Sequence, residues 1–227
     1  MNKYIEIKNL SKNYFSQKKV IVLKKINYSF RKGKIYSLVG PSGSGKSTLL
    51  NILSLIDRPS SGNLIINNKK VNFENIKDND KLRSKNFGII YQENNLLTDF
   101  TAKENIMLAG LANKKTLNES LKLTDKILTK LSLKKRSEHF PSELSGGENQ
   151  RIAIGRALIN SPNIIIADEP SGNLDHKNAK EFFKLLFKLK SKSRIILYAT
   201  HNRYFANLAD CRLKLINGKL KSINARI

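Results

Sequence analysis

Hydrophobic and polar residues alternate over short stretches of the first third of the chain, and this period of two predicts β-strands. The stretches cover residues 4–7, 20–23, 26–30 and 35–39. The pairs Asn67-Asn68 and Asn217-Gly218 each separate two such stretches, which predicts hairpins over residues 63–71 and 213–223. The early hairpins therefore predict an antiparallel sheet in this part of the molecule.

The second half of the chain changes to a helical period. Residues 116–133, 147–160 and 177–190 are predicted helices, the first with an apolar stripe of Leu121, Ile127, Leu128 and Leu131. Residues 163–167, apolar after Asn163, and residues 195–199 show no alternation, as is typical of central strands in a parallel sheet. Strands that alternate with helices predict an α/β fold.

Composition adds one unusual property, a formal charge of +24 over 227 residues. Three explanations stay open: a compositional bias toward scattered lysine, attraction to an anionic membrane surface, or nucleic-acid binding. The single cysteine, Cys211, cannot form an internal disulfide and is interpreted as a small packing residue, which fits a reducing compartment.

Membrane insertion is not predicted, because no apolar run approaches the ~18–20 residues needed to cross a bilayer. Residues 1–6 alternate polar and apolar, as a strand does and a signal peptide does not. Any membrane role is therefore expected to be peripheral.

A phosphate-binding loop is the most specific motif. It matches G-x-x-x-x-G-K-[ST] in full as Gly40-Pro41-Ser42-Gly43-Ser44-Gly45-Lys46-Ser47, and Thr48, which follows, is included among the expected nucleotide-binding residues. The predicted strand over 35–39 precedes the motif. A predicted helix with apolar Leu49, Ile52, Leu53 and Ile56 follows it. Glycines let the backbone approach a polyphosphate, whose oxygens meet N–H groups and the helix N-terminus. Lys46 is expected at the β- and γ-phosphates, and the Ser47 hydroxyl on Mg²⁺.

Two carboxylates end the apolar strand over 163–167. Asp168 is expected to hold Mg²⁺ through water, and Glu169 to accept a proton from the attacking water.

The segment Leu144-Ser145-Gly146-Gly147-Glu148 resembles the signature motif of ABC transporters, and it lies between the phosphate loop and the Asp-Glu pair, in that family's order. A Ser-Gly-Gly turn that opens a helix is a second anion site. The resemblance implies a head-to-tail homodimer that binds ATP and Mg²⁺, in which Ser145, Gly146 and Gly147 cap the γ-phosphate held by the other subunit. It also implies hydrolysis of ATP.

Other family elements follow along the chain. The resemblance makes Gln92 the Q-loop glutamine, which contacts Mg²⁺ and the attacking water, and His201 the switch histidine at the γ-phosphate. Residues 171–175, with Asp175, resemble the D-loop that crosses the dimer interface. Tyr14 stands where the family stacks an aromatic ring on adenine, with Phe15 or a core role for Tyr14 as alternatives.

The resemblance also implies how the domain is divided. It predicts one ABC ATPase domain over residues 1–227, with a P-loop NTPase (RecA-like) core and antiparallel β-subdomain at 1–92 and 156–227. Residues 93–155 are expected to form the helical subdomain that carries the signature.

A finer resemblance is to the LolD/MacB/FtsE group, from residues 96–105, 141–144 and 167–175. It implies a LolD-like subunit on the cytoplasmic face of the bacterial inner membrane, docked on permease subunits like LolC and LolE, that drives lipoprotein release toward the outer membrane. MacB-like export and FtsE-like cell division are alternatives. A DNA-associated ATPase is less favoured, and no nucleic-acid partner is expected, because the motifs lie too close together for coiled-coil arms. The sequence departs from the residues usual in these relatives at Glu93-Asn94-Asn95, Asn149 and Asn202.

Overall fold

The computed structural model describes residues 3–15 and 18–223, which form two compact units. The first unit contains residues Met1–Arg83 and Lys190–Ile227, and the second contains Ser84–Leu189. Neither boundary coincides with the expected limits of the helical subdomain at residues 93 and 155, so that division stays a prediction.

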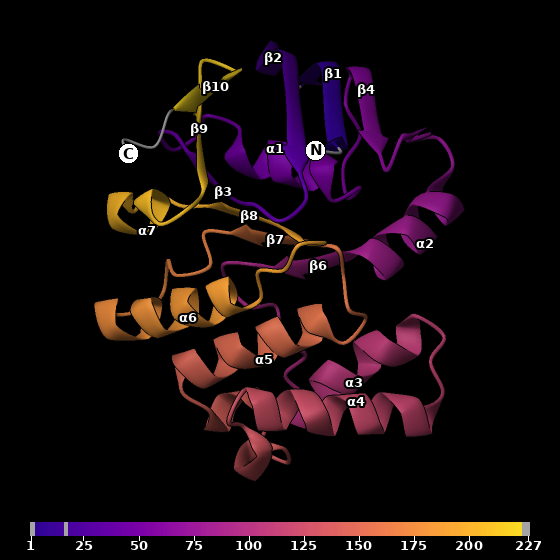
Figure 1. Cartoon of the computed structure of the whole chain (residues 1–227), viewed down its shortest axis with the longest axis vertical. Helices are drawn as coiled ribbons and strands as arrows, with labels where there is room; N and C mark the ends of the chain where they lie inside the picture. Colours follow the sequence, from indigo (N-terminus) through magenta and orange to yellow (C-terminus); the bar gives the residue numbers. More distant parts are fainter. Residues whose placement is uncertain (1–2, 16–17, 224–227) are drawn as a thin grey trace. The chain divides into compact units, whose positions relative to one another are not determined.

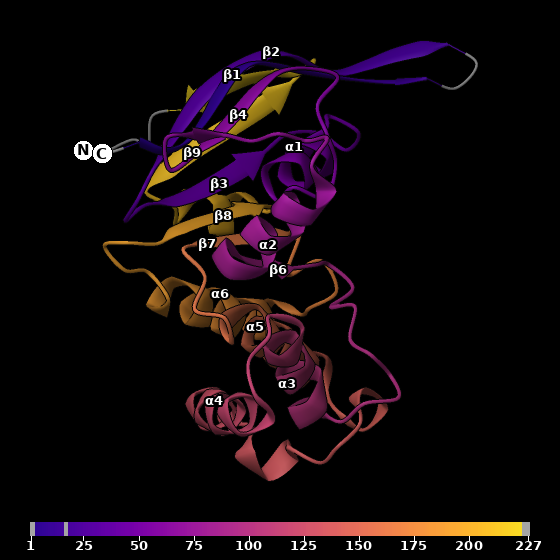
Figure 2. The same ribbon diagram turned by 90° about the vertical axis from the view of Figure 1, so that its right-hand side faces the viewer.

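The antiparallel sheet predicted for the early chain belongs to the first unit and has the strand order β2-β1-β4-β5 (Figure 1). Its strands are β1 (Lys3–Phe15), β2 (Lys19–Arg31), β4 (Ser61–Ile66) and β5 (Lys69–Lys70). The stretches at 20–23 and 26–30 are one strand instead of two, because bulges between β1 and β2 shift the register without ending it. Beyond Ser11, β1 pairs with β2 alone, and the two strands run on past β4 (Figure 2).

Parallel strands form the rest of the first unit's framework. The strand β3 (Ile35–Val39) pairs in parallel with β8 (Ile195–Ala199) and with β9 (Cys211–Ile216), and β9 forms a hairpin with β10 (Lys219–Ile223). Both predicted hairpin turns are confirmed, since Asn67, Asn68, Asn217 and Gly218 have the positive φ that such tight turns require.

Three helices lie in or begin in the first unit. Helix α1 (Lys46–Leu53) buries Leu49, Ile52 and Leu53. The prediction that Ile56 extends this apolar stripe is wrong, because the helix ends before Ile56, which is 45% exposed. Helices α2 (Ile76–Asn86) and α7 (Arg203–Asn207) were not expected from the sequence.

The second unit pairs two parallel strands, β6 (Phe87–Ile90) and β7 (Ile164–Asp168), with four α-helices and two 3₁₀ turns. The helices are α3 (Ala102–Ala112), which was not predicted, α4 (Leu117–Lys130), α5 (Gly146–Leu158) and α6 (His176–Lys188), and the turns are η1 (Lys134–Arg136) and η2 (Pro141–Glu143). Helix α5 contacts α3, α4, α6 and β6, which places it at the centre of this unit.

The buried face of α4 differs from the predicted stripe. Leu128 and Leu131 are buried, but Ser120 and Thr124 are buried too, and Leu121 is only half-buried. Gly110 of α3 explains part of this difference, because a Cβ there would stand 2.9 Å from the Ser120 hydroxyl, so α3 and α4 approach closely at small residues.

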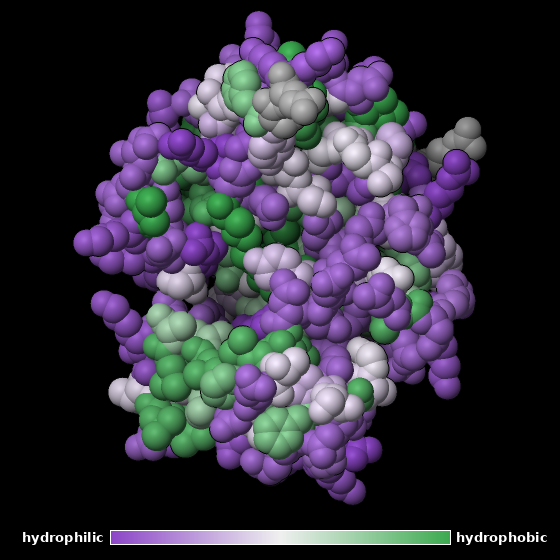
Figure 3. Space-filling model, turned by 180° about the vertical axis from the view of Figure 1, so that it is seen from behind, coloured by the Kyte–Doolittle hydropathy of each residue, from purple (hydrophilic) through white to green (hydrophobic). Residues whose placement is uncertain are grey.

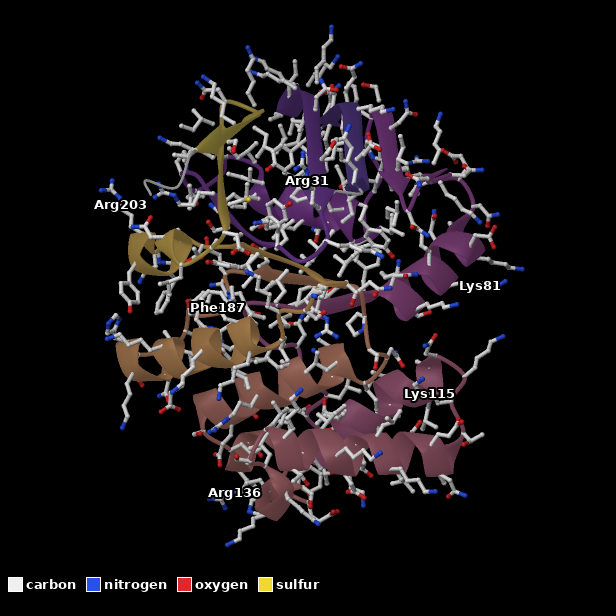
Figure 4. The ribbon with its side chains drawn as sticks, in the orientation of Figure 1. Arg31, Lys81, Lys115, Arg136, Phe187 and Arg203 are labelled. Carbon is white, nitrogen blue, oxygen red and sulfur yellow. The ribbon has the colours of Figure 1, made fainter. Side chains whose placement is uncertain are left out.

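Basic side chains are spread over the whole chain. Figure 4 labels Arg31, Lys81, Lys115, Arg136 and Arg203, which come from five separate segments. None of the helices in the described part of the chain is both long and apolar enough to cross a bilayer.

Candidate functional site

The phosphate loop connects β3 to α1 within the first unit. Gly43 (φ 72°) and Gly45 (φ 98°) have left-handed backbone conformations that L side chains rarely adopt. Gly45 is the N-cap of α1 and supplies no side-chain hydrogen bond to the helix. The N-terminus of α1 is therefore not capped by its N-cap side chain, and the positive end of the helix dipole favours an anion there.

Gly40, at the start of the loop, packs closely against the backbone of β9. A Cβ at Gly40 would stand 2.3 Å from the carbonyl oxygen of Leu215 in β9, so this position accommodates only glycine without a shift of the backbone. The loop residues Pro41, Ser42 and Gly43 are exposed. A backbone cradle without side-chain obstruction fits a polyphosphate.

Lys46 bends back over this loop. Its ammonium donates to the carbonyl oxygens of Gly40 (3.0 Å) and Pro41 (3.2 Å), and only 9% of the residue is exposed. The charge is thus fixed above the cradle, where it can meet a phosphate oxygen. The next residue, Ser47, is exposed, and Thr48 is half-buried.

Tyr14 belongs to a small polar cluster near the end of β1. Its hydroxyl donates to Asp57 Oδ2 (2.8 Å), while Lys12 Nζ donates to Asp57 Oδ1 (2.7 Å) and lies 4.7 Å from the centre of the tyrosine ring. Burial alone would raise the pKa of Asp57, but the hydrogen bonds from Lys12 and Tyr14 outweigh it and hold the pKa below its ordinary value. The Tyr14 ring is 43% exposed, so it retains surface on which a flat group could stack.

Sequence reasoning missed Lys12 and Asp57 as neighbours of Tyr14. Asp57 lies 43 residues from Tyr14 and 45 from Lys12 along the chain, and no local motif links them. Phe15, the alternative stacking residue, is 76% exposed.

His201 follows β8 in the first unit and is exposed, next to the buried Thr200. Asn202 is the N-cap of α7, where its Oδ1 accepts from the N–H groups of Tyr204 (2.9 Å) and Phe205 (3.4 Å). Asparagine and aspartate are equally good N-cap residues. Asn202, which stands where the family usually has aspartate, therefore keeps the helix cap that directly follows His201.

Asp168 and Glu169 lie at the carboxyl end of β7 in the second unit, and both are half-buried. The backbone of Glu169 has φ 43°, a strained value for a residue with a side chain. Its carbonyl oxygen accepts from the N–H of Gly172 (3.0 Å), which closes a turn directly after the strand.

The predicted Q-loop and D-loop meet within the second unit. A Cβ at Gly172 would stand 3.0 Å from Nε2 of Gln92, so the glycine gives the exposed glutamine room to pack against the loop. Gln92 follows β6 and precedes Asn94 (φ 58°) and Asn95 (φ 45°). Asparagine tolerates the left-handed region better than most residues, which gives the departure at 93–95 a structural reason.

Arg156 was not predicted as part of this region. Its guanidinium, on the last turn of α5, donates to the backbone carbonyl oxygens of Asn94 and Asn95. More than 60 residues separate the partners, so only the folded structure identifies this contact.

The signature segment opens α5 with Ser145 as the N-cap. The Ser145 hydroxyl accepts from the Glu148 N–H (3.3 Å), and the Glu148 carboxylate accepts from the Ser145 N–H (2.9 Å) and hydroxyl (2.9 Å). Arg136 Nε donates to the same carboxylate (3.2 Å). Although burial acts in the opposite direction, these bonds, led by the Ser145 N–H, hold the pKa of Glu148 below its ordinary value.

Asp175 caps the next helix, α6, and accepts from the N–H of Asn178 (2.9 Å). The Asn178 side chain lies between this carboxylate and the signature, because a Cβ at Gly147 would stand 3.2 Å from Asn178 Oδ1. Asn149, the third departure, donates from Nδ2 to the Pro141 carbonyl oxygen (2.9 Å). The predicted signature and D-loop are thus adjacent within one unit.

The predicted site residues therefore form two groups. The first unit holds Tyr14, residues 40–48 and His201, and the second holds Gln92, Ser145, Gly146, Gly147, Asp168, Glu169 and Asp175. No cluster of three or more His, Cys, Asp or Glu side chains suited to a metal ion occurs among residues 3–15 and 18–223. The residues predicted to bind a cation carry a hydroxyl (Ser47), an amide (Gln92) and a carboxylate (Asp168). Their oxygen atoms are the type of ligand that a hard ion prefers.

Comparison with known proteins identifies the family. Residues 23–172 match the model of the ABC transporter family. The chain is 44% identical over 222 residues to the lipoprotein-releasing system ATP-binding protein LolD of Wigglesworthia glossinidia brevipalpis, covering 97% of each chain. It is 43% identical to the LolD of Rickettsia bellii, covering 96% of this chain and 98% of the other.

Solved structures agree with this result. The dimeric post-hydrolysis structure of the ATP-binding cassette MJ0796, bound to ADP and Pi, superposes with a TM-score of 0.89 at 33% identity, covering 98% of this chain and 99% of that one. The predicted α/β P-loop NTPase fold is confirmed. The chain belongs to the ABC transporter family, and within that family it resembles the LolD proteins.

Proposed function

We propose that this protein is the ATP-binding and ATP-hydrolysing subunit of an ABC transporter that releases lipoproteins from the inner membrane toward the outer membrane. The observation that carries the proposal is the glycine cradle with Lys46 bent over it, in a chain 44% identical to a LolD protein across nearly its full length. ATP supplies the phosphoanhydride bond whose hydrolysis drives the cycle, and Mg²⁺ screens its phosphate charge.

Residues of the first unit bind the nucleotide. The N–H groups of residues 40–48 and the ammonium of Lys46 hold the phosphates, and Tyr14 supports the adenine ring from a position fixed by Asp57. The exposed Ser47 would supply its hydroxyl as a ligand for Mg²⁺. His201, beside the α7 cap, contacts the γ-phosphate.

Residues of the second unit have the other proposed roles. Asp168 would hold Mg²⁺ through water, and Gln92 would contact Mg²⁺ and orient the attacking water. Glu169 accepts a proton from that water. Its strained backbone favours a fixed carboxylate direction, since a strained conformation persists only where the surroundings hold it.

A second copy of the chain brings its signature segment to the nucleotide. Ser145, Gly146 and Gly147 open α5 with a helix dipole directed at an anion, and Asp175 borders them through Asn178. Support comes from MJ0796, described as dimeric with ADP and Pi. ATP closes the homodimer, and hydrolysis opens it again.

Membrane-spanning permease subunits of the LolC and LolE kind are the further partners, which places the protein peripherally on the cytoplasmic face of the inner membrane. The second unit offers a surface for them. Leu97 is 47% and Phe100 is 38% exposed, and Met107, Leu108 and Leu111 of the neighbouring α3 are half-buried. Figure 3 shows apolar side chains gathered on the lower part of this face of the molecule. An apolar area of this kind favours a protein partner. No nucleic-acid partner is proposed.

The experiment that tests the catalytic proposal compares Glu169→Gln with the wild type in an ATPase assay. Loss of the general base is expected to lower turnover by about 10²–10⁴-fold while ATP binding persists. Glu74→Gln, which changes an exposed carboxylate paired with Arg58, is the matched control and should retain full turnover. Undiminished turnover in Glu169→Gln would exclude Glu169 as the base.

A separate experiment tests the partners. Affinity purification from native membranes should recover two related membrane proteins with large periplasmic domains. A single division-site protein instead would favour the FtsE-like alternative and leave the ATPase proposal unchanged.

A further inference from the structure

The part of β1 that carries Tyr14 has only one neighbouring strand. Between Ile5 and Ser11, β1 pairs with β2 on one side and with β4 on the other, whereas its described residues from Lys12 to Phe15 pair with β2 alone (Figure 2). A ribbon of two strands is marginally stable by itself. The position of the Tyr14 ring therefore depends on contacts that take the place of β4.

The segment that follows α1 supplies such contacts. Ser60 donates its N–H to the carbonyl oxygen of Ser11 (2.8 Å), and its hydroxyl accepts from the N–H of Asn13 (3.0 Å). In the same segment, the N–H of Asp57 donates to the carbonyl oxygen of Asn51 in α1 (3.2 Å). The two-stranded ribbon is thus joined through this segment to the helix at whose start the phosphate loop lies.

Lys12 is the most buried charged residue of this connection. Its ammonium donates to Asp57 Oδ1 (2.7 Å) and to the carbonyl oxygen of Arg58 (2.8 Å), and only 8% of the residue is exposed. A lysine is rarely buried unless it is paired, so these two bonds fix the ammonium. The other oxygen of Asp57 accepts from the Tyr14 hydroxyl (2.8 Å). One carboxylate thus holds both the cation and the phenol.

The Lys12 ammonium also limits which face of the Tyr14 ring can receive a ligand. It lies over one face, 4.7 Å from the ring centre. A flat base cannot stack on the face that the lysine covers, so only the opposite face is left for it. Burial raises the pKa of Tyr14, and the nearby Thr48 side chain of α1 acts in the opposite direction. The hydroxyl end of the ring therefore lies beside the helix of the phosphate loop.

We infer that Lys12 is a positioning residue for the nucleotide base. It holds Asp57, which holds the Tyr14 hydroxyl, and it occupies one face of the ring, so that a purine stacks on the other face at a fixed place relative to the phosphate loop. The inference rests on the proposed function, in which Tyr14 supports the adenine ring. A side chain that is already fixed loses less freedom when the base binds, which favours affinity.

The test compares two ligands of the full chain by isothermal titration calorimetry: the nonhydrolysable analogue β,γ-imido-ATP, and inorganic tripolyphosphate, which has no base. Lys12→Met should weaken binding of the analogue by about tenfold, within the range that stacking of a base on an aromatic ring contributes, and should change the affinity for tripolyphosphate by less than about twofold. A residue that only stabilises the fold would affect both ligands alike. Equal losses for the two ligands would therefore overturn the inference.

Two further proteins complete the comparison. Lys8→Met changes an exposed lysine of the same strand and should leave both affinities as in the wild type. Lys12→Met combined with Asp57→Asn removes both charges of the partly buried pair, so no unpaired charge remains if the single substitution fails to fold. This double variant should show the same selective loss. An affinity for the analogue equal to that of Lys8→Met would contradict the role of Lys12.

Tyr14→Ala separates this inference from the proposed function. It should weaken binding of the analogue by about tenfold or more and leave tripolyphosphate binding unchanged, because the stacking surface is lost. If Tyr14→Ala has this effect and Lys12→Met does not, the inference fails while the stacking of adenine on Tyr14 stands. If neither substitution weakens the analogue, the stacking assignment fails too, and the ATPase proposal, which is tested at Glu169, is unaffected.

Discussion

Helices α1 and α5 both have glycine at their N-termini, Gly45 as the N-cap of α1 and Gly146 as the first residue of α5, yet the two ends differ in how they are capped. The N-cap of α1 is Gly45, which provides no side-chain acceptor. The N-cap of α5 is Ser145, whose hydroxyl and N–H are both engaged with Glu148 in a capping box. The first helix is open to an external anion, whereas the second already contains its own acceptor and its own negative charge.

This difference separates two functions of a helix N-terminus. At α1 the missing cap is a cost to the isolated chain that a bound phosphate removes. At α5 the cap stabilises the helix without a ligand, so the proposed contact with a second subunit's nucleotide requires Ser145 to exchange one partner for another. Arg136, which pairs with Glu148, favours that exchange by holding the carboxylate when the hydroxyl leaves.

The largest expected effect tests the open terminus. Lys46→Gln removes the cation fixed over the cradle and should weaken ATP binding by about 100-fold, since a charge-assisted hydrogen bond and a full charge are lost. A fluorescent ATP analogue titrated against the protein measures this change. Lys69→Gln, at an exposed position of β5, is the control, and equal affinities in the two variants would remove Lys46 from the site.

A smaller effect is expected at the capped terminus. Ser145→Ala should lower the free energy of unfolding by about 1 kcal/mol, because the N-cap acceptor is lost. ATP affinity of the monomer should stay unchanged, while ATP-dependent dimerisation weakens. Urea denaturation and analytical ultracentrifugation separate these results. An unchanged stability would mean that the capping box does not support α5.

The smallest effect concerns pH. The pKa of Glu148 is lowered in the folded protein, so its carboxylate stabilises the fold above the ordinary value of 4.5, and this contribution is lost as the pH falls through the lowered value. Glu148→Gln should therefore be about 0.5 kcal/mol less stable than the wild type at pH 7.

Urea denaturation of both proteins at pH 7, 5 and 3 measures the pH dependence. The difference between them should shrink toward the lowest pH. A difference that is the same at pH 7 and pH 3 would show that ionised Glu148 is not responsible.

The elements that the sequence predicted well have strong local signals. Strands β3 and β8 agree with their predicted limits because short, continuously or alternately apolar runs end at glycine or at polar residues. The two hairpin turns follow from asparagine and glycine, which accept positive φ.

The missed helices lack such signals. Helix α2 is polar on nearly every side and buries only Asn79, so it has no apolar stripe to detect. Helix α7 has five residues, which is too short for a period. Helix α3 could have been found from Thr101 and Glu104, which form a capping box three residues apart.

The candidate site also contains residues that a local sequence pattern predicts and contacts that no local pattern predicts. Residues 40–48 and 144–148 follow from contiguous motifs, whereas the contacts of Tyr14 with Asp57 and of Arg156 with Asn94 join residues 43 and 62 positions apart. No local pattern encodes such pairs. They arise from how strands and helices pack, so only coordinates identify them.

Helix α5 touches three of the predicted loops along its length. Ser145 lies at its start, Gln150 reaches the carbonyl oxygen of Pro170 directly after Glu169, and Arg156 holds Asn94 and Asn95 near its end. Its 13 residues span about 20 Å, and an α-helix resists shortening because each turn is hydrogen-bonded to the next. The helix is therefore stiff and attached at three places, so a displacement of the segment beside the proposed permease surface is expected to move Ser145, the serine proposed to contact the nucleotide, as well.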